Sequence, residues 1–281
     1  MRFTDTPVDI CVLTFCSGHS SEDDHYDLIA RCLHSIIGNT DQSRYRLSIG
    51  CNNPSPRVLE LVRTLGERDN TRWIIGEAAR DGNDVPVYPK YPMMERLFAD
   101  TRSPWLVWFD DDSCVTEPTW LDSLEDAINA DTGAAQFGKQ ADVPLMNPDP
   151  GWMETAPWYS PSANCEKLDL DDGTQRVVCP YIVGGFYALR RDAMQKCRIP
   201  DPRLFHNHGD WTTGLALRHQ GFTIKHHTQG VAINTEPRRG IHEDLWRAPG
   251  KAADLQQESI RRDRLLFERP RAPGGTGARF D

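Results

Sequence analysis

The sequence predicts an α/β fold in which a mixed, mainly parallel sheet is flanked by helices. Through residues 8–115, short apolar runs alternate with segments whose apolar residues recur at helical spacing, and this indicates parallel strands joined by right-handed crossovers. With 281 residues, 38% of them hydrophobic, the chain is long enough for one large domain. We expect this domain at residues 1–250, with halves 1–115 and 116–250, followed by a C-terminal helix and flexible tail at 251–281.

The first half is expected to alternate strands and helices in a regular way. Gly38 and Asn39 end the first helix, and Pro56 suits the first turn of the second. The expected strands are 9–16, 45–51, 72–75 and 105–109, and the expected helices are 26–37, 56–65, 91–99 and 118–130.

The second half is less regular in sequence. Residues 131–178 are rich in Pro, Asp and Trp, and we expect them to be irregular. The aromatic residues of 151–159 either stack on a sugar or base or pack their loop onto the core. The Gly184-Gly185 pair stands between two apolar runs, where it allows close approach of the backbone to a ligand or forms a bulge that only the fold requires. A helix is expected from Asp210 onward, and a strand at 222–227.

Three carboxylates, Asp110, Asp111 and Asp112, directly follow the buried strand expected at 105–109. Like charges packed together raise each other's pKa unless a cation lies among them. On an extended chain Asp110 and Asp112 point the same way, and two such oxygen ligands suit Mg²⁺ or Mn²⁺. The alternative is a solvated acidic turn in which Ser113 caps the next helix.

Polar residues follow three of the expected parallel strands, at Cys16-Ser17, Asn52-Asn53 and Asp110–Asp112. Ligands of such sheets bind beyond the carboxyl ends of the strands, so a binding site is predicted at this edge. Asp210 stands at the beginning of a helix, where an anion is also stabilised without any functional role.

Bulk composition narrows the class of protein. The net charge of −9 argues against a general nucleic-acid binder. None of the eight cysteines forms a CxxC pair, so we expect no zinc cluster and several buried free thiols. No run has the length of a membrane span, and the N-terminal residues lack the apolar core of a signal peptide. We therefore expect a soluble protein of the cytoplasm, or of the host cytoplasm if a phage encodes it.

Four motifs follow one another along the chain: the Asn52-Asn53 strand end, Trp108-Phe-Asp-Asp-Asp112, Gly184-Gly-Phe-Tyr-Ala-Leu-Arg-Arg191 and Gly209-Asp-Trp-Thr-Thr-Gly214. In this order, over residues 8–245, they resemble a glycosyltransferase of the GT-A fold and the family 2 type. The Asp triplet is moderately specific, and its combination with the two later motifs carries the resemblance. The implied architecture is the Rossmann-like, mainly parallel sheet of GT-A enzymes.

The resemblance implies a role for each motif. The donor site would be bordered by Cys16 and Ser17, with Asn52 or Asn53 where the family often has an Asp that contacts the uracil or ribose. Asp110 and Asp112 match the DxD motif that holds the metal and the diphosphate, and Asp111 takes a supporting or ribose-side role. Gly184 and Gly185 line the acceptor side. Asp210 matches the catalytic base, although the usual Glu-Asp pair is Gly209-Asp210 here. His242, or else His227, would complete the metal site.

These residues suit sugar transfer from a nucleotide-diphosphate sugar, with a UDP-sugar favoured, to an acceptor hydroxyl. The leaving diphosphate gains charge, which Mn²⁺ or Mg²⁺ at Asp110 and Asp112 would neutralise. Arg238 or Arg239 could add to this, since a guanidinium matches phosphate. Asp210 would take the proton of the attacking hydroxyl, and a single base opposite the leaving group implies inversion at the anomeric carbon.

The motifs do not identify the acceptor molecule. The segment Lys90-Tyr-Pro-Met-Met94 resembles a branch with phage and metagenomic enzymes, some of which modify hydroxymethyl-pyrimidines in DNA. A DNA acceptor predicts that the Trp152 and Trp158 loop takes a flipped base. It also predicts phosphate contacts near the cleft from Arg190, Arg191, Arg238, Arg239 and Arg247. The alternative acceptors are a polysaccharide or other glycan, a lipid-linked sugar and a protein.

Two other classes of function remain as alternatives. A nucleotidyltransferase shares nucleotide-binding folds and paired Asp residues, but it favours a basic, Gly-rich loop after the first strand, which residues 17–24 do not supply. A non-catalytic carbohydrate-binding protein is disfavoured by the intact Asp triplet and Asp210.

Overall fold

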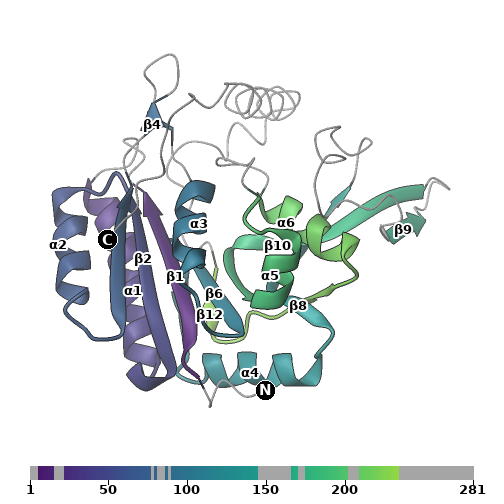
Figure 1. Ribbon diagram of the computed structural model, residues 1–281, viewed down its shortest axis with the longest axis horizontal. Coiled ribbons are helices and arrows are strands. Elements are labelled where there is room, and N and C mark those ends of the chain that lie inside the picture. Colours follow the sequence, from purple (N-terminus) through teal and green to yellow (C-terminus); the bar gives the residue numbers. More distant parts are fainter. Residues whose placement is uncertain are drawn as a thin grey trace.

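The computed structural model describes residues 6–15, 22–76, 79–80, 86–87, 90–144, 166–169, 175–201 and 209–233. Within these residues, eight strands form one mixed sheet, in which seven follow the order β11-β8-β10-β6-β1-β2-β3 and the remaining one, β9, pairs with β10 (Figure 1). The described strands of this sheet are β1 (Val8–Phe15), β2 (Tyr45–Asn52), β3 (Thr71–Gly76), β6 (Trp105–Asp110), β8 (Ala134–Pro144), β9 (Glu166–Asp169), β10 (Gln175–Arg190) and β11 (Thr223–His226).

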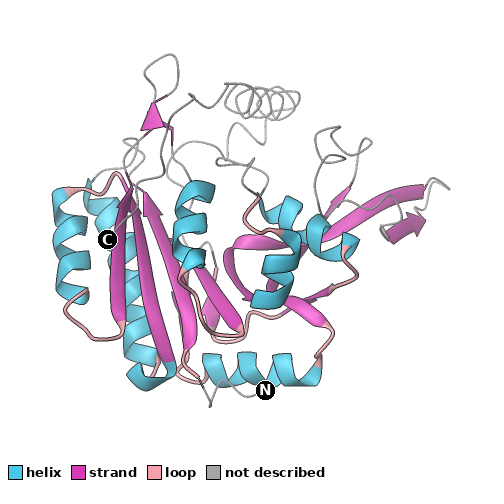
Figure 2. Ribbon diagram, in the orientation of Figure 1, coloured by secondary structure: helices cyan, strands magenta, loops and turns pink. Residues whose placement is uncertain are grey.

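Helices cover both faces of this sheet (Figure 2). The described helices are α1 (Glu22–Asn39), α2 (Pro56–Leu65), α3 (Lys90–Ala99), α4 (Trp120–Ala130), α5 (Arg191–Cys197) and α6 (Gly209–His219), with a 3-10 turn, η2 (Gln42–Arg44), before β2. Short two-residue strands form two further pairs, β4 (Ala79–Arg80) with β5 (Pro86–Val87), and β7 (Cys114–Val115) with β12 (Val231–Ala232).

The α/β prediction is confirmed. β1 pairs in parallel with both β2 and β6, and β2 pairs in parallel with β3. The sheet then changes direction, because β10 runs antiparallel to β6 and to β8, while β11 returns parallel to β8. One sheet therefore runs through both expected halves of the chain. Residues 251–281, with the expected C-terminal helix and tail, lie outside the described residues.

Strand alternation divides the core into two layers. Val8, Ile10 and Val12 of β1 pack with α1, α2 and α4, whereas Cys11 and Leu13 face the opposite side and pack with α3, α5 and α6. Successive side chains of a strand point to opposite faces, so both faces of the central strands are apolar and buried. This is why these strands read as unbroken apolar runs in the sequence.

The prediction that residues 131–178 are irregular is wrong over much of its length. β8, β9 and the beginning of β10 all lie there. β8 has few β-branched residues, but it lies between β10 and β11, which supply hydrogen-bonding partners along its two edges. Sheet context thus overrides weak strand propensity. The helix α5 was also missed.

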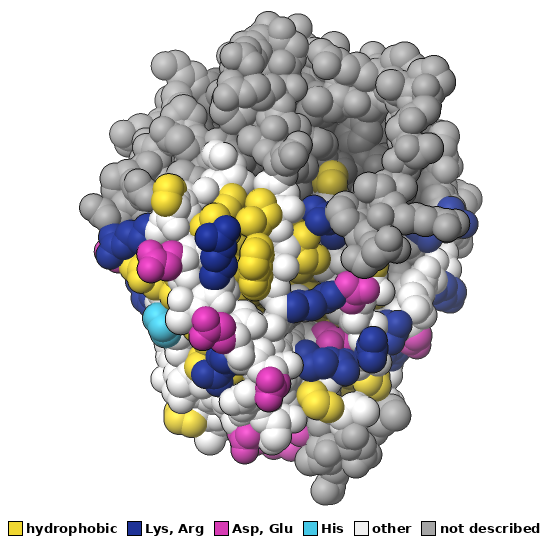
Figure 3. Space-filling model, turned by 60° about the vertical axis from the view of Figure 1, so that its left-hand side comes forward, with side chains coloured by type: hydrophobic (Ala, Val, Ile, Leu, Met, Phe, Trp, Pro, Cys, Tyr) yellow, Lys and Arg dark blue, Asp and Glu magenta, His cyan; other side chains and the backbone are white. Residues whose placement is uncertain are grey.

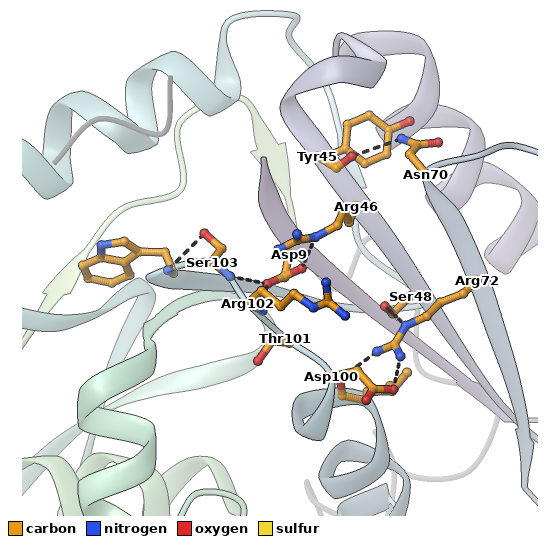
Figure 4. Close-up of polar contacts among 12 residues, drawn as sticks. Asp9, Tyr45, Arg46, Ser48, Asn70, Arg72, Asp100, Thr101, Arg102 and Ser103 are labelled. Carbon is orange, nitrogen blue, oxygen red and sulfur yellow. Dashed lines mark hydrogen bonds and ion pairs between the residues drawn. The ribbon is translucent and has the colours of Figure 1, made fainter. Parts of the chain in front are cut away.

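A polar network joins the amino ends of the central strands (Figure 4). The buried carboxylate of Asp9 accepts hydrogen bonds from Arg46 Nε at 2.8 Å and from the backbone N–H groups of Arg102 at 2.6 Å and Ser103 at 2.7 Å. Arg72 bonds to Ser48 and pairs with the exposed Asp100 nearby. These contacts fix β1 against the turn that enters β6, at the edge of the sheet opposite Asp110.

No described helix is both long and apolar enough to cross a lipid bilayer. The expectation of buried free thiols is met by four described cysteines, Cys11, Cys32, Cys51 and Cys197, and Cys114 is a partly exposed free thiol.

Candidate functional site

The carboxyl ends of β1, β2 and β6 meet at one edge of the sheet. Phe15 of β1 pairs with Asn52 of β2, and Leu13 pairs with Asp110 of β6. Asn52 and Asp110 therefore flank the same strand end, as the sequence predicted. The third predicted strand end, Cys16-Ser17, lies outside the described residues.

The three aspartates do not share one direction. Asp110 is the last residue of β6, and like Trp108 it faces the α3 side. Its Oδ1 accepts a hydrogen bond from Trp108 Nε1 at 2.9 Å. The ammonium of Lys90, the first residue of α3, lies 3.2 Å from Oδ1 and 3.3 Å from Oδ2. The positive charge of Lys90, at the beginning of α3, therefore balances the negative charge of Asp110.

Asp111 points to the opposite face of the sheet. Only 4% of its surface is exposed, and its Oδ2 accepts a hydrogen bond from Thr14 Oγ1 at 2.7 Å. The fully buried His25 of α1 lies 2.8 Å from the same hydroxyl and 3.7 Å from the carboxylate. This contact ties the acidic turn to β1 and α1.

Asp112 lies in a turn, because the Ser113 N–H bonds to the Asp110 carbonyl at 3.1 Å. The extended geometry that would align Asp110 with Asp112 ends at the last residue of β6. The half-buried Asp112 follows within this turn, so the turn, and not strand alternation, sets its position relative to Asp110.

The two asparagines after β2 differ in setting. Asn52 is buried and its side chain covers Gly76 on β3, where any Cβ would collide with its Oδ1. Asn53 is exposed and has a left-handed φ of 53°, a conformation that Asn tolerates better than most residues. Asn53 thus presents its side chain at the strand-end edge, whereas Asn52 supports the sheet beneath it.

Asp210 faces the Gly184-Gly185 segment. It lies in the first turn of α6, whose amino end stabilises an anion. A Cβ built on Gly184 would lie 2.5 Å from Asp210 Oδ2, so the glycine makes room for the carboxylate. The β10–β8 register shifts between Ile182 and Tyr187, so the strand pairing is irregular around the glycine pair, as expected for a bulge. The close neighbour of Gly184 in the structure is the Asp210 carboxylate, and the approach of a ligand to this segment stays a prediction.

Two consecutive residues of α3 connect Asp110 with Asp210. Lys90 pairs with Asp110, while the phenol of Tyr91 occupies the space where a side chain at Gly209 would stand. This packing gives a physical reason for Gly209, since a glutamate there would collide with Tyr91. The two acidic positions, a hundred residues apart in sequence, are thus held by neighbouring side chains of one helix.

The side chain of Tyr187, on β10, is close enough to Asp110 and Asp210 for their negative charges to affect its pKa. Burial, then the charge of Asp210, then Tyr91 and Asp110 raise the pKa of Tyr187 well above its usual value. Burial and then Asp210 raise the pKa of Tyr181 as well. Both phenols stay protonated at neutral pH, so they can act as hydrogen-bond donors near Asp210 without adding negative charge.

The carboxylates at this edge fit a hard divalent ion by their chemistry, but Asp110 already holds an ammonium group. Among the residues that the structure describes, no three His, Cys, Asp or Glu side chains are grouped to hold a metal. An ion there would need Asp110 and Asp112 together with ligands from a substrate or water. His242, Arg238 and Arg239 lie outside the described residues.

The structure does not bring His227 to the acidic turn. It follows β11, which β8 and β10 separate from β6, and it lines a surface hollow with α4 residues that include Asp122 and Asp126. Burial and then His226 lower the pKa of His227, so its imidazole is neutral at pH 7.

The predicted approach of Arg190 and Arg191 to the cleft is not met. Arg190 pairs across the sheet with Trp105, at the beginning of β6, and bonds to Asp192 and to the Thr132 carbonyl. An antiparallel strand that ends at Arg190 necessarily carries it to the edge opposite Asp110. Basic and acidic side chains are also interspersed over the described part of the face in Figure 3. Trp152, Trp158 and Arg247 lie outside the described residues.

Sequence reasoning gave no site role to Lys90, Tyr91 or Tyr187, nor to Thr14 and His25 beneath the acidic turn. A lysine and a tyrosine that open a helix after a loop carry no local signal for a site. A weak signal existed at Tyr187, since it follows Gly185 by two residues in the same motif.

Comparisons with known proteins identify the family and the fold of the chain. The family model described as Glycosyltransferase like family 2 matches residues 16–247. A comparison with curated protein sequences finds no match. Among solved structures, the mannosyltransferase PcManGT from Pyrobaculum calidifontis, in complex with GDP-Man and Mn²⁺, is similar with a TM-score of 0.52 and 15% identity. The alignment covers 90% of this chain and 64% of that one.

Residues 1–349 of S. aureus TarS, in complex with UDP-GlcNAc, are similar with a TM-score of 0.46 and 11% identity. That alignment covers 76% of this chain and 54% of the TarS chain. The chain therefore spans less than two thirds of the length of each of these two structures. At 15% identity, the likeness to PcManGT shows the fold alone.

Proposed function

The chain belongs to the glycosyltransferase-like family 2, and on this premise we propose that it transfers a sugar from a nucleotide-diphosphate sugar to an acceptor hydroxyl. The observation that carries the proposal is the α3 bridge, in which Lys90 contacts Asp110 and Tyr91 packs on Gly209 beside Asp210. Through these two contacts, α3 holds the acidic turn at Asp110, proposed to face the diphosphate, at a fixed position relative to the separate carboxylate of Asp210. A displacement at a sugar carbon needs such a pair of sites, one for the leaving group and one for the nucleophile.

The strand-end edge of β1, β2 and β6 is the donor side in this proposal. Asn53 is exposed there for the nucleoside, and Asp110 and Asp112 lie where the diphosphate would end. A divalent ion, Mn²⁺ or Mg²⁺, held by these two carboxylates would supply Lewis-acid stabilisation of the leaving diphosphate. Asp111, bonded to Thr14, keeps the turn in place from the opposite face.

Asp210 is the proposed base for the acceptor hydroxyl. It is partly exposed, and its carboxylate lies against Gly184, where the lack of a side chain makes room for it. The neighbouring phenols of Tyr181 and Tyr187 are protonated, so in this group of three side chains the carboxylate is the proton acceptor. One base opposite the leaving group implies inversion at the anomeric carbon.

The test begins with sugar transfer and donor hydrolysis by the wild-type protein across UDP-, GDP- and dTDP-sugars with Mn²⁺. Asp210→Asn should lower turnover by about 10²- to 10⁴-fold with little change in donor affinity, because only proton transfer is removed. Asp192→Asn is the matched control, since Asp192 is an exposed helix-start carboxylate at the opposite edge. Near-full turnover of Asp210→Asn with intact donor binding would contradict the proposed base.

We favour a UDP-sugar as donor from the resemblance to family 2 enzymes, with a GDP-sugar as the second choice because PcManGT is in complex with GDP-Man. For the acceptor we favour a glycan hydroxyl over a hydroxymethyl-pyrimidine in DNA. The reason is that Arg190 and Arg191, which a DNA acceptor would recruit, lie at the opposite edge of the sheet. Acceptor trials should include both, and transfer to hydroxymethyl-pyrimidine DNA alone would overturn this preference.

A further inference from the structure

The contact between Lys90 and Asp110 differs in its burial from the ion pair between Lys225 and Asp131. The Lys90 and Asp110 side chains are only 16% and 20% exposed, whereas those of Lys225 and Asp131 are 49% and 35% exposed. Screening by water is weaker at the more buried pair, so its electrostatic coupling is the stronger one. The ammonium also lies 5.9 Å from the centre of the Trp108 ring, within cation–π range.

Three elements fix this ammonium at the carboxylate. Strand alternation puts Trp108 and Asp110 on the α3 face of β6, and the Trp108 indole holds Oδ1 by a hydrogen bond. Helix α3 lies over β1 and β2 and buries Met93, Met94 and Leu97 in the layer below it. Its first residue is thereby held above the end of β6, and the lysine reaches both oxygens of Asp110.

We propose that Lys90 and a divalent cation are alternative partners of Asp110, and that donor binding moves the Lys90 ammonium from this carboxylate to the diphosphate. The inference rests on the proposed function for the identity of the donor. A divalent ion approaches a carboxylate oxygen to about 2.1 Å, and an ammonium that contacts both oxygens of the same group would lie beside it and repel it. The ion therefore binds Asp110 only as the ammonium leaves.

The diphosphate gives the displaced ammonium a new partner. It carries negative charge at the same strand end, and the flexible lysine stem lets the ammonium move without moving α3. Metal and donor should then bind cooperatively, because each removes the obstacle to the other. Without a donor, Lys90 compensates the charge of Asp110 and weakens the binding of metal alone.

The experiment is a titration of Mn²⁺, followed by the EPR signal of the free ion, on wild-type protein and variants without any nucleotide. Lys90→Met should bind Mn²⁺ at least about tenfold more tightly than wild type, a change of ~1.4 kcal/mol. Lys225→Met, the exposed control, should match wild type. In an Asp110→Asn background the Lys90→Met effect should vanish, because the two cations no longer compete for one group.

A second arm measures the affinity for UDP and GDP at saturating Mn²⁺. Lys90→Met should weaken binding of the preferred nucleotide about tenfold, and Lys90→Arg should keep it nearly intact. Thermal unfolding checks that each variant folds, and Lys90→Gln replaces Lys90→Met if the latter does not. Unchanged or weaker Mn²⁺ binding by the neutral variant would overturn the competition, as would a gain that persists with Asp110→Asn. Sugar transfer by the wild type, assayed separately, reports on the proposed function and is independent of these titrations.

Discussion

Gly184→Ala is the substitution that most directly tests the position of Asp210. The added methyl would lie 2.5 Å from Asp210 Oδ2, 2.7 Å from Oδ1 and 2.9 Å from Cγ. The first distance is about 0.9 Å short of ordinary contact, so the carboxylate must move by nearly that amount. A misplacement of ~1 Å in a reacting group can cost about 10²-fold in rate. We expect kcat to fall by about 10- to 100-fold, or ~1.4 to 2.8 kcal/mol in activation free energy.

The assay is steady-state sugar transfer together with donor binding and thermal unfolding of the same samples. Donor affinity should stay close to wild type, since Gly184 faces Asp210 and not the acidic turn at Asp110. Gly133→Ala is the control, because a Cβ there meets its nearest atom, Asp131 Oδ1, at 3.5 Å. If Gly184→Ala kept kcat within about twofold of wild type at unchanged Tm, the placement of the base beside this glycine would be refuted.

Three further predictions concern the scaffold. Asp9→Ala should lower the free energy of unfolding by about 2 to 4 kcal/mol in urea titrations, because three donors lose a buried acceptor, whereas the exposed Asp100→Ala should cost less than about 1 kcal/mol. Gly209→Ala should cost about 1 to 3 kcal/mol by the same measurement, and less in a Tyr91→Ala background that vacates the space. Burial, and then the charge of Asp111, raise the pKa of Cys51 from 9.0 to about 12. Its contribution to stability is therefore complete below pH 9 and falls by about 1.4 kcal/mol per pH unit above it, a slope that Cys51→Ala should remove from urea unfolding between pH 8 and 10.

The first half of the fold could be predicted because its central strands are buried on both faces. Ile10 and Leu47 belong to unbroken apolar runs, and the intervening helices show regular apolar spacing, so local patterns alone identify them. β8 could not be predicted in this way. Its residues pair with β10 and β11, which are far away in sequence, and its strand character comes from those neighbours.

The candidate site was predicted in its residue types and only partly in its geometry. Asp110 and Asn52 do lie at one edge of the sheet. Each stands at the carboxyl end of its strand, and the carboxyl ends of neighbouring parallel strands lie at the same edge. The expected extended chain from Asp110 to Asp112 is not present, because the chain turns directly after Asp110. Arg190 was expected near the cleft, but the antiparallel direction of β10 takes it to the far edge.

The sequence by itself determined the α/β class, the parallel strands, the acidic strand end and the carboxylate at Asp210, because periodicity and residue chemistry are local properties. Only the tertiary structure decided what stands beside those carboxylates. Asp110 forms an ion pair with Lys90, and Asp111 accepts a hydrogen bond from Thr14. The Asp210 carboxylate lies against Gly184, which has no side chain to exclude it. Each of these partners comes from another strand or helix, and such contacts depend on strand order, strand direction and helix position, which no local pattern encodes.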